Sequence, residues 1–379
     1  MILHIFIIMF FVLLAAIIFP NFEHNFNKKL YLWIAFSLLF FLSAFRSIEI
    51  GNDTSYYVNM YKYYGNSSNF VSISYLFSFE NIINSRIEPG YVLLNMVLNI
   101  FSKEYILLFI VTSLFILGTW KKHIQKNSEI VWLSVLLFFN LRFFYFTLSG
   151  LRQAIAMSII LISYEHLKKR NLKLFVMQVL IASLFHLSAL VFLIAYPLTK
   201  WKINFKIVGI YFLIASLGYL SFDKILNLLL PIFPKYQMYL SSSYLDGNIR
   251  TMSIINFLIA FVISIFGMIT TKKIYKYSKS LYNKDENFDE INVLNNIVLV
   301  SAVVAFISIK ASIIGRFHIY FFMFTVIYIP KALKLIKNND LRTLMTFIIV
   351  ILFILYNLII LYYRPEWQNV YPYRFIWDI

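Results

Sequence analysis

The sequence predicts an all-α polytopic membrane protein with about 11 or 12 transmembrane helices and two long extracytoplasmic loops. Of the 379 residues, 61% are hydrophobic and only 13% are charged, against about 25% charged residues in a typical soluble domain. The mean hydropathy is +0.76, and apolar stretches of about 20 residues, long enough to cross a bilayer, recur along the whole chain. These observations exclude an ordinary soluble enzyme. We treat residues 1–379 as a single integral membrane domain.

Helices are expected because lipid cannot satisfy exposed backbone groups, and the alternating pattern of a membrane barrel is absent. Residues 2–19 form the first apolar stretch. They lack the basic start and the small-residue cleavage site of a signal peptide. We therefore expect a retained first helix.

Short basic runs separate the apolar stretches and mark cytoplasmic loops. The excess of 34 Lys and Arg over 17 Asp and Glu falls mainly in these runs, so topology explains it and no nucleic-acid partner is expected. The runs are Lys28–Lys29 and residues 121–126, 168–173, 200–206, 272–284 and 331–342.

The spacing of the basic runs predicts each crossing in turn. Residues 30–45 lead outward to a polar loop at 46–88, residues 90–101 form a short surface or re-entrant helix, and residues 105–120 return. Three hairpins that leave the cytoplasm and come back to it are expected from residues 130–146 with 151–167, 207–222 with 253–271 around a loop at 223–250, and 293–309 with 317–329.

Residues 172–198 lie between two basic runs, so a single straight span would place one run on the wrong side. We expect a short, kinked helical pair with its apex near His186. The last span, 343–363, places the tail at 364–379 outside.

This topology places seven ionisable residues on the outer face, where charges at membrane depth are functional candidates. They are Arg46, Asp53, Glu88, Arg152, His186, Arg250 and Arg316. The loops at 46–88 and 223–250 carry many Tyr, Ser and Asn residues, which suit sugar binding but also an interfacial belt.

Each motif has a structural alternative. Arg46 could anchor the chain at the interface with Gly51-Asn52-Asp53 as a turn, and Glu88-Pro89 could simply begin a helix. Arg152 stands at a predicted outer hairpin tip beside Gly150, where a guanidinium could bind phosphate oxygens.

Arg142 and Arg316 lie in the same predicted outer zone, and all three arginines could instead extend to lipid headgroups. A histidine in an apolar run, as at His186, is often a satisfied core residue, but its place at the predicted apex favours chemistry. There are no cysteines, no P-loop, no HExxH, no dinucleotide fingerprint and no Asp-x-Asp pair. We expect no metal, no cofactor and no cytoplasmic nucleotide-activated donor.

Taken in order, these motifs resemble the EpsG-type family of Wzy-like bacterial polysaccharide polymerases. The resemblance runs from about Arg46 to the tail and rests on an ordered set of short motifs. They are Arg46 with Gly51, Asp53 and Tyr57; Glu88 with Gly90; Arg152-Gln153-Ala154; Phe185-His186-Leu187-Ser188; Gly315-Arg316; and Pro372-Tyr373.

The resemblance implies a polymerase of O-antigen, exopolysaccharide or other surface polysaccharide in the bacterial cytoplasmic membrane. It would transfer a growing glycan from undecaprenyl diphosphate to the terminal sugar of a lipid-linked repeat unit. Its partners would be membrane lipids, a chain-length regulator and a flippase. Arg152 and Arg316, with Arg46 as a weaker third arginine, would bind the substrate diphosphate, and Gln153 would also bind the substrate. His186 is the first choice for the base, with Asp53 and Glu88 as alternatives.

Three other functions remain open at this point. A ligase that joins finished glycan to lipid A core would use the same donor. A flippase or secondary transporter would show internal repeats and ionisable residues near the midplane, and no repeat is visible. A membrane scaffold would leave the outer arginines unexplained.

Overall fold

The computed structural model describes residues 1–18, 25–66, 69, 71–85, 87–229, 231, 237, 245, 248–278 and 286–378. Within these residues the protein is helical and has no strand, only an isolated antiparallel bridge between Arg46 and Phe375. Most of the expected 223–250 loop and part of the basic run at 272–284 lie outside the described residues.

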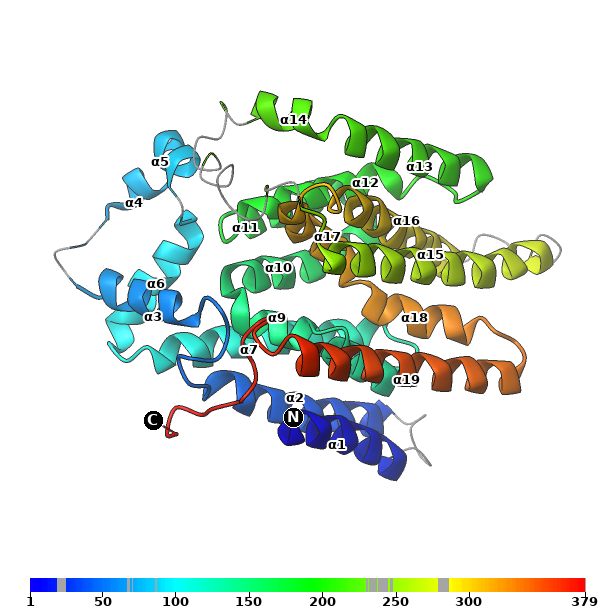
Figure 1. Cartoon of the computed structure of the whole chain (residues 1–379), viewed down its shortest axis with the longest axis horizontal. Coiled ribbons are helices and arrows are strands. Elements are labelled where there is room, and N and C mark those ends of the chain that lie inside the picture. Colours follow the sequence, from blue (N-terminus) through cyan, green and yellow to red (C-terminus); the bar gives the residue numbers. More distant parts are fainter. Residues whose placement is uncertain are drawn as a thin grey trace. The chain divides into compact units, whose positions relative to one another are not determined.

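The chain forms two compact units, and Figure 1 traces their helices along the sequence. Unit 1 comprises residues 1–71, 90–162 and 336–379, and unit 2 comprises residues 72–89 and 163–335. Each unit is therefore built from segments that are distant in the sequence.

Unit 1 is built around the fully buried rings of Trp120 and Phe138, which lie 4.5 Å apart. Helix α2 packs on α7, and α8 packs on α1, α2 and α19. The helices that lie mainly in this unit are α1 (Ile2–Ile18), α2 (Asn25–Ala44), α3 (Thr54–Tyr64), α6 (Pro89–Phe101), α7 (Ile106–Asn127), α8 (Val131–Asn140), α9 (Phe143–Ser149), α10 (Leu151–Lys168, which ends in unit 2) and α19 (Asn339–Tyr363).

Unit 2 is centred on α16, which packs against α13, α15, α17 and α18. Gly267 permits the close approach of α15 and α18, because a Cβ there would lie 1.8 Å from the Tyr328 hydroxyl. The helices of this unit are α4 (Ile73–Leu76), α5 (Phe79–Asn84), α11 (Leu172–Ser183), η3 (Leu187–Ile194), α12 (Ala195–Leu198), α13 (Phe205–Leu220), α14 (Phe222–Leu229), α15 (Thr251–Ser278), α16 (Glu286–Ile307), η5 (Ser312–Ile314), α17 (Gly315–Phe322) and α18 (Thr325–Lys334).

The described residues include 4 helices long and apolar enough to cross a bilayer, or up to 7 if each bent pair is one span. This agrees with an all-α polytopic membrane protein but is fewer than the 11 or 12 crossings expected. The difference arises because several expected crossings are shorter apolar helices, such as α1, or carry charges inside them, as α10 does with Arg152 and Glu165.

Two of the expected spans are bent: helices α8 and α9 meet at 48°, and α17 and α18 meet at 48°. A third bend, of 66° between α13 and α14, falls at the end of the expected span 207–222, and α14 occupies the start of the expected 223–250 loop. The first bend is at Arg142, whose φ of +68° is left-handed. A non-glycine residue in this conformation is uncommon and costs energy, so Arg142 must be held there by its contacts.

The kinked pair expected at residues 172–198 is confirmed. Helix α11 ends at Ser183, His186 is extended, and η3 then runs back along α11. The Phe175 ring lies 5.6 Å from the Tyr196 ring, and the Tyr196 hydroxyl donates to the Arg170 carbonyl. The start and end of the pair are therefore close together, and His186 lies at the turn.

Candidate functional site

In unit 2, Glu88 and His186 form a direct pair. The Glu88 Oε1 atom lies 3.1 Å from His186 Nδ1 and also accepts from the Leu187 backbone N–H at 3.4 Å. The two side chains are only 10% and 15% exposed. Two of the three residues predicted as acid or base are thus in contact, although 98 positions separate them in the sequence.

The Glu88–His186 pair has the arrangement of a base and its orienting group. When His186 Nδ1 carries the proton, Glu88 accepts its hydrogen bond, which leaves Nε2 with its lone pair. A carboxylate in this position fixes the imidazole ring and stabilises the imidazolium that forms on proton transfer.

Arg316 belongs to the same region of unit 2. It lies in the first turn of α17, which packs on η3. Tyr320, one turn later, accepts a hydrogen bond from the Ser188 hydroxyl at 3.2 Å. Residues four apart share a helix face, so Arg316 is placed on the face of α17 that meets the His186 turn.

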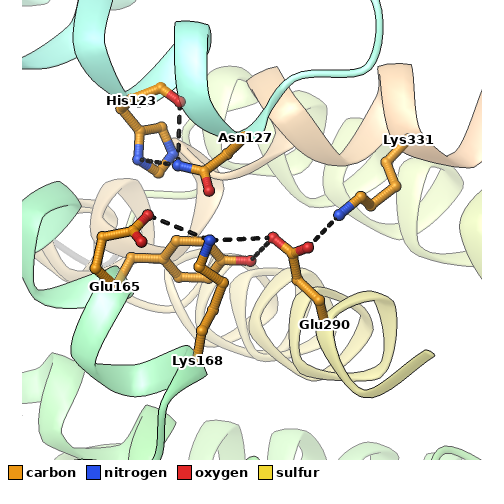
Figure 2. Close-up of polar contacts among 7 residues, drawn as sticks. His123, Asn127, Glu165, Lys168, Glu290 and Lys331 are labelled. Carbon is orange, nitrogen blue, oxygen red and sulfur yellow. Dashed lines mark hydrogen bonds and ion pairs between the residues drawn. The ribbon is translucent and has the colours of Figure 1, made fainter. Parts of the chain in front are cut away.

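Unit 2 has a second polar group near the start of α16, around Glu290, which Figure 2 shows. Glu290 binds Lys331 through Oε2 and Lys168 through Oε1, at 3.6 Å for the second pair, and accepts from the Tyr164 hydroxyl. Lys168 also reaches Glu165 at 3.2 Å. The ends of the predicted cytoplasmic loops therefore meet at Glu290.

The two polar groups of unit 2 are separated by about the thickness of a bilayer. From Glu290 to Ile307, helix α16 rises about 26 Å, and the hydrocarbon core is about 30 Å thick. The turn after α16 leads into α17, which begins at Gly315, and the bent α17–α18 pair returns to bring Lys331 back to Glu290. Arg316 thus lies at the end opposite the lysines.

Unit 1 holds the other predicted arginines. Arg46 follows α2 and is fully buried, with its guanidinium 4.0 Å from the centre of the Phe109 ring. Its Nη1 donates to the Ser43 carbonyl at 2.5 Å, and within the described residues its Nε and Nη2 have no hydrogen-bond acceptor.

The surroundings of Arg46 are aromatic. Burial lowers the pKa of its guanidinium to about 10, and the hydroxyls of Tyr373, Tyr57 and Tyr91 act in the opposite direction. The side chain is therefore charged at neutral pH, and among the described residues only tyrosine hydroxyls act against the effect of burial. A buried cation of this kind is costly unless an anion reaches it.

Arg152 shares two of these tyrosines. It lies in the first turn of α10 and donates to the hydroxyl of Tyr57, whose ring lies 5.6 Å from that of Tyr91. Burial raises the pKa of Tyr57 to about 12 against the effect of Arg152, so the hydroxyl is neutral at pH 7. Two guanidinium groups therefore act on one pair of tyrosines, which we call the arginine cluster of unit 1: Arg46, Tyr57, Tyr91 and Arg152.

The remaining predicted residues have clear places. Asp53 is exposed just before α3, where its charge acts on Tyr57, and Gln153 is buried next to Arg152. Asp53 belongs to unit 1, and Glu88 and His186 belong to unit 2. Arg250 directly precedes α15 in unit 2.

Arg142 has a structural role that the sequence does not reveal. Its Nε, Nη1 and Nη2 atoms donate to the Gln368 side chain, the Asn357 side chain and the Trp367 carbonyl, each at 3.1 Å. These bonds hold the tail that follows α19 against the bend between α8 and α9. We therefore assign Arg142 to this tail anchor and not to substrate binding.

The segment after α2 is fixed from two sides. Gly51 has a φ of +92°, and a Cβ there would lie 2.4 Å from the Leu148 carbonyl oxygen, so only glycine fits. The Thr54 hydroxyl also donates to the Leu148 carbonyl, and the Gly51 N–H donates to the Asn369 carbonyl at 2.9 Å. The end of α2, the end of α9 and the tail thus meet in unit 1, as expected for segments on one face.

Sequence reasoning missed the partners that join these residues. Tyr57 and Ser188 stood inside quoted motifs without a role, and no role was predicted for Tyr91 or Tyr320. No group of three or more His, Cys, Asp or Glu residues that could hold a metal occurs in the described part of the chain.

The model of the EpsG family matches residues 29–375, nearly the whole chain. No curated protein and no solved structure matches the chain.

Proposed function

The chain belongs to the EpsG family, and from this premise we propose that it is a glycosyltransferase that polymerises surface polysaccharide at the bacterial cytoplasmic membrane. Membership of the family suggests a polysaccharide polymerase. The proposed substrates are a growing glycan on undecaprenyl diphosphate and a lipid-linked repeat unit. The proposed site is on the outer face.

The observation that carries this proposal is the Glu88–His186 pair at the turn of the 172–198 hairpin. Ser188, two residues after His186, hydrogen-bonds to Tyr320 on α17, one turn after Arg316. An acceptor hydroxyl would give its proton to His186 Nε2 as its oxygen forms a bond to C1 of the donor sugar. The bond between C1 and the diphosphate oxygen breaks, and the diphosphate leaves with the electron pair. Glu88 would stabilise the imidazolium.

Arginines would stabilise the charge that develops on the leaving diphosphate. Arg316 is the candidate in unit 2, and Arg152 with Arg46 are the candidates in unit 1. The unsatisfied Nε and Nη2 of buried Arg46 support this assignment, because a group of that kind is stabilised by an anion.

The test is a complementation of a strain that lacks the gene. Wild-type protein should restore glycan longer than one repeat unit, whereas His186→Ala and Glu88→Gln should each leave single repeats at normal protein level. His166→Ala, a histidine near the Lys168 end of α10, is the matched control and should behave as wild type. Long glycan from both His186→Ala and Glu88→Gln would show that the base lies elsewhere.

The same strains separate a polymerase from a ligase. A polymerase deletion leaves one repeat unit attached to the final acceptor, because transfer to that acceptor continues. A ligase deletion instead leaves long glycan on the lipid carrier. That second outcome would overturn the proposed reaction.

A further inference from the structure

A hollow of about 450 Å³ with both polar and apolar walls opens in unit 1 between residues 48–55 and the tail residues 369–374. Its volume falls within the ~300–1,000 Å³ of small-ligand sites. The side chains that matter for its chemistry are those of Glu49, Asn52, Ser55, Asn369, Pro372 and Arg374. None of them was predicted as a site residue, although Asn52 and Pro372 stood in quoted motifs.

The two walls of the hollow are held together by the chain itself. The Ser47 N–H donates to the Arg374 carbonyl and the Gly51 N–H donates to the Asn369 carbonyl, both at 2.9 Å. The Asn369 side-chain N–H donates to the Glu49 carbonyl at 2.6 Å, and Arg142 donates to Trp367 and Gln368, which directly precede Asn369. The hollow is therefore formed before any ligand arrives, which reduces the cost of binding.

Stability does not explain the charged pair in the hollow. Glu49 Oε2 and Arg374 Nη1 lie 2.6 Å apart, with side chains 57% and 52% exposed. An ion pair this exposed contributes little to folding. A ligand would use it more fully, because the carboxylate accepts hydrogen bonds and the guanidinium donates them.

The chemistry of the hollow fits an uncharged polyhydroxyl compound. The charges of Glu49 and Arg374 cancel, so neither an anion nor a cation is favoured. The amides of Asn52 and Asn369 and the Ser55 hydroxyl can each donate and accept. Pro372 offers an apolar surface for the C–H face of a sugar ring.

The wall at residues 48–55 is continuous with the arginine cluster of unit 1, because Arg46 precedes it and Tyr57 follows it. In a lipid-linked glycan the first sugar is bonded directly to the diphosphate, so sugar and diphosphate sites must be neighbours. We propose that this hollow is a subsite for one or two uncharged sugar residues of the lipid-linked glycan. The inference rests on the proposed function.

The test replaces an exposed residue that lines the hollow with a large side chain that fills it. Asn52→Trp should weaken binding of the repeat-unit oligosaccharide, freed from its lipid, by about tenfold or more, the loss of about 1.4 kcal/mol. Binding is measured by saturation-transfer NMR on the full-length protein in nanodiscs. Asn59→Trp, at another exposed asparagine, on α3 and outside the hollow, is the control and should bind as wild type.

A second variant does not depend on tolerance of tryptophan. Arg374→Gln keeps the backbone pairing with Ser47 and removes only the guanidinium, so it should also weaken the oligosaccharide and shorten the polymer in cells. If wild type polymerises and both variants bind and polymerise like it, the subsite is wrong and the polymerase stands. If wild type binds the oligosaccharide, loses it with Asn52→Trp, but makes no polymer, the subsite stands and the polymerase is wrong. If wild type does not bind the oligosaccharide, the subsite is overturned.

Discussion

At the scale of single residues, arginine rather than lysine at position 152 is the strongest indication of a phosphate-binding role. Arg152 donates to Tyr57, which is neutral at pH 7 because burial raises its pKa to about 12. The tyrosine therefore orients the guanidinium without cancelling its charge. A planar fork held in this way suits two oxygens of one phosphate, whereas lysine presents a point charge.

We predict that Arg152→Lys reaches the membrane at wild-type level but yields mostly single-repeat or very short glycan. Loss of one contact that strengthens as the leaving group departs costs about 2–4 kcal/mol, or roughly thirtyfold to a thousandfold in rate. Glycan gels at matched expression measure it. Arg364→Lys, at an arginine 67% exposed in its side chain, is the control. Wild-type chain length from Arg152→Lys would identify it as a headgroup anchor.

The identity of these residues could be predicted from the sequence, but their pairing could not. Topology placed Glu88 and His186 on one face without showing that they touch, and so left them as alternatives for one role. Contact across 98 positions depends on how the hairpin of α11 and η3 packs. The structural role of Arg142 was hidden for the same reason, since its acceptors lie more than 200 positions away.

At the scale of elements, Glu290 links the first turns of α16 to α10 and α18 (Figure 2). The Lys331 side chain is only 9% exposed and that of Glu290 17%. When one partner of a buried pair is removed, the other is left as an unpaired charge, which destabilises far more than loss of the whole pair.

We predict that Glu290→Gln lowers the free energy of unfolding by about 3 kcal/mol, seen as earlier thermal unfolding in detergent. The double variant Glu290→Leu with Lys331→Met should recover most of the loss, because the unpaired Lys331 charge is gone and Lys168 keeps its ion pair with Glu165. Equal thermal stability of wild type and Glu290→Gln would show that water solvates Lys331 well enough without the carboxylate.

The sequence predicted best the elements that have a basic run at each end. The basic runs on both sides of residues 172–198 required a turn, and the structure has it at His186. The bends inside residues 130–149 and 312–334 were missed, because an apolar stretch gives no sign of where its backbone departs from a helix. At Arg142 the left-handed φ is imposed by the tail, which is remote in the sequence.

At the scale of the whole molecule, the contacts within each unit agree with the predicted division of the chain into cytoplasmic and outer ends. In unit 1 the tail meets the segment after α2, and in unit 2 the lysines around Glu290 lie at the opposite end of α16 from Arg316. The arrangement within each unit agrees with the basic-run topology. Which end faces the cytoplasm stays a prediction.

We predict that single cysteines at Ser74 and Glu366 react with an impermeant thiol reagent in spheroplasts, whereas cysteines at Lys169 and Asp340 react only after permeabilisation. The four exposed positions give one outer and one inner probe for each unit, and the native chain has no cysteine to add background. Reversed labelling of all four would invert the topology and move the proposed site to the cytoplasmic face.

The discontinuity of unit 1 has a consequence for biogenesis. Its residues up to 162 leave the ribosome well before α19, and all of residues 163–335 are made in between. At about 5–20 residues per second, the roughly 200 residues from the end of the early segment to the end of α19 take roughly 10–40 s. During that interval Arg142 lacks Asn357 and Gln368, and Ser47 and Gly51 lack their carbonyl partners. The hollow proposed as a sugar subsite is therefore incomplete until α19 and the tail residues that follow it have been made.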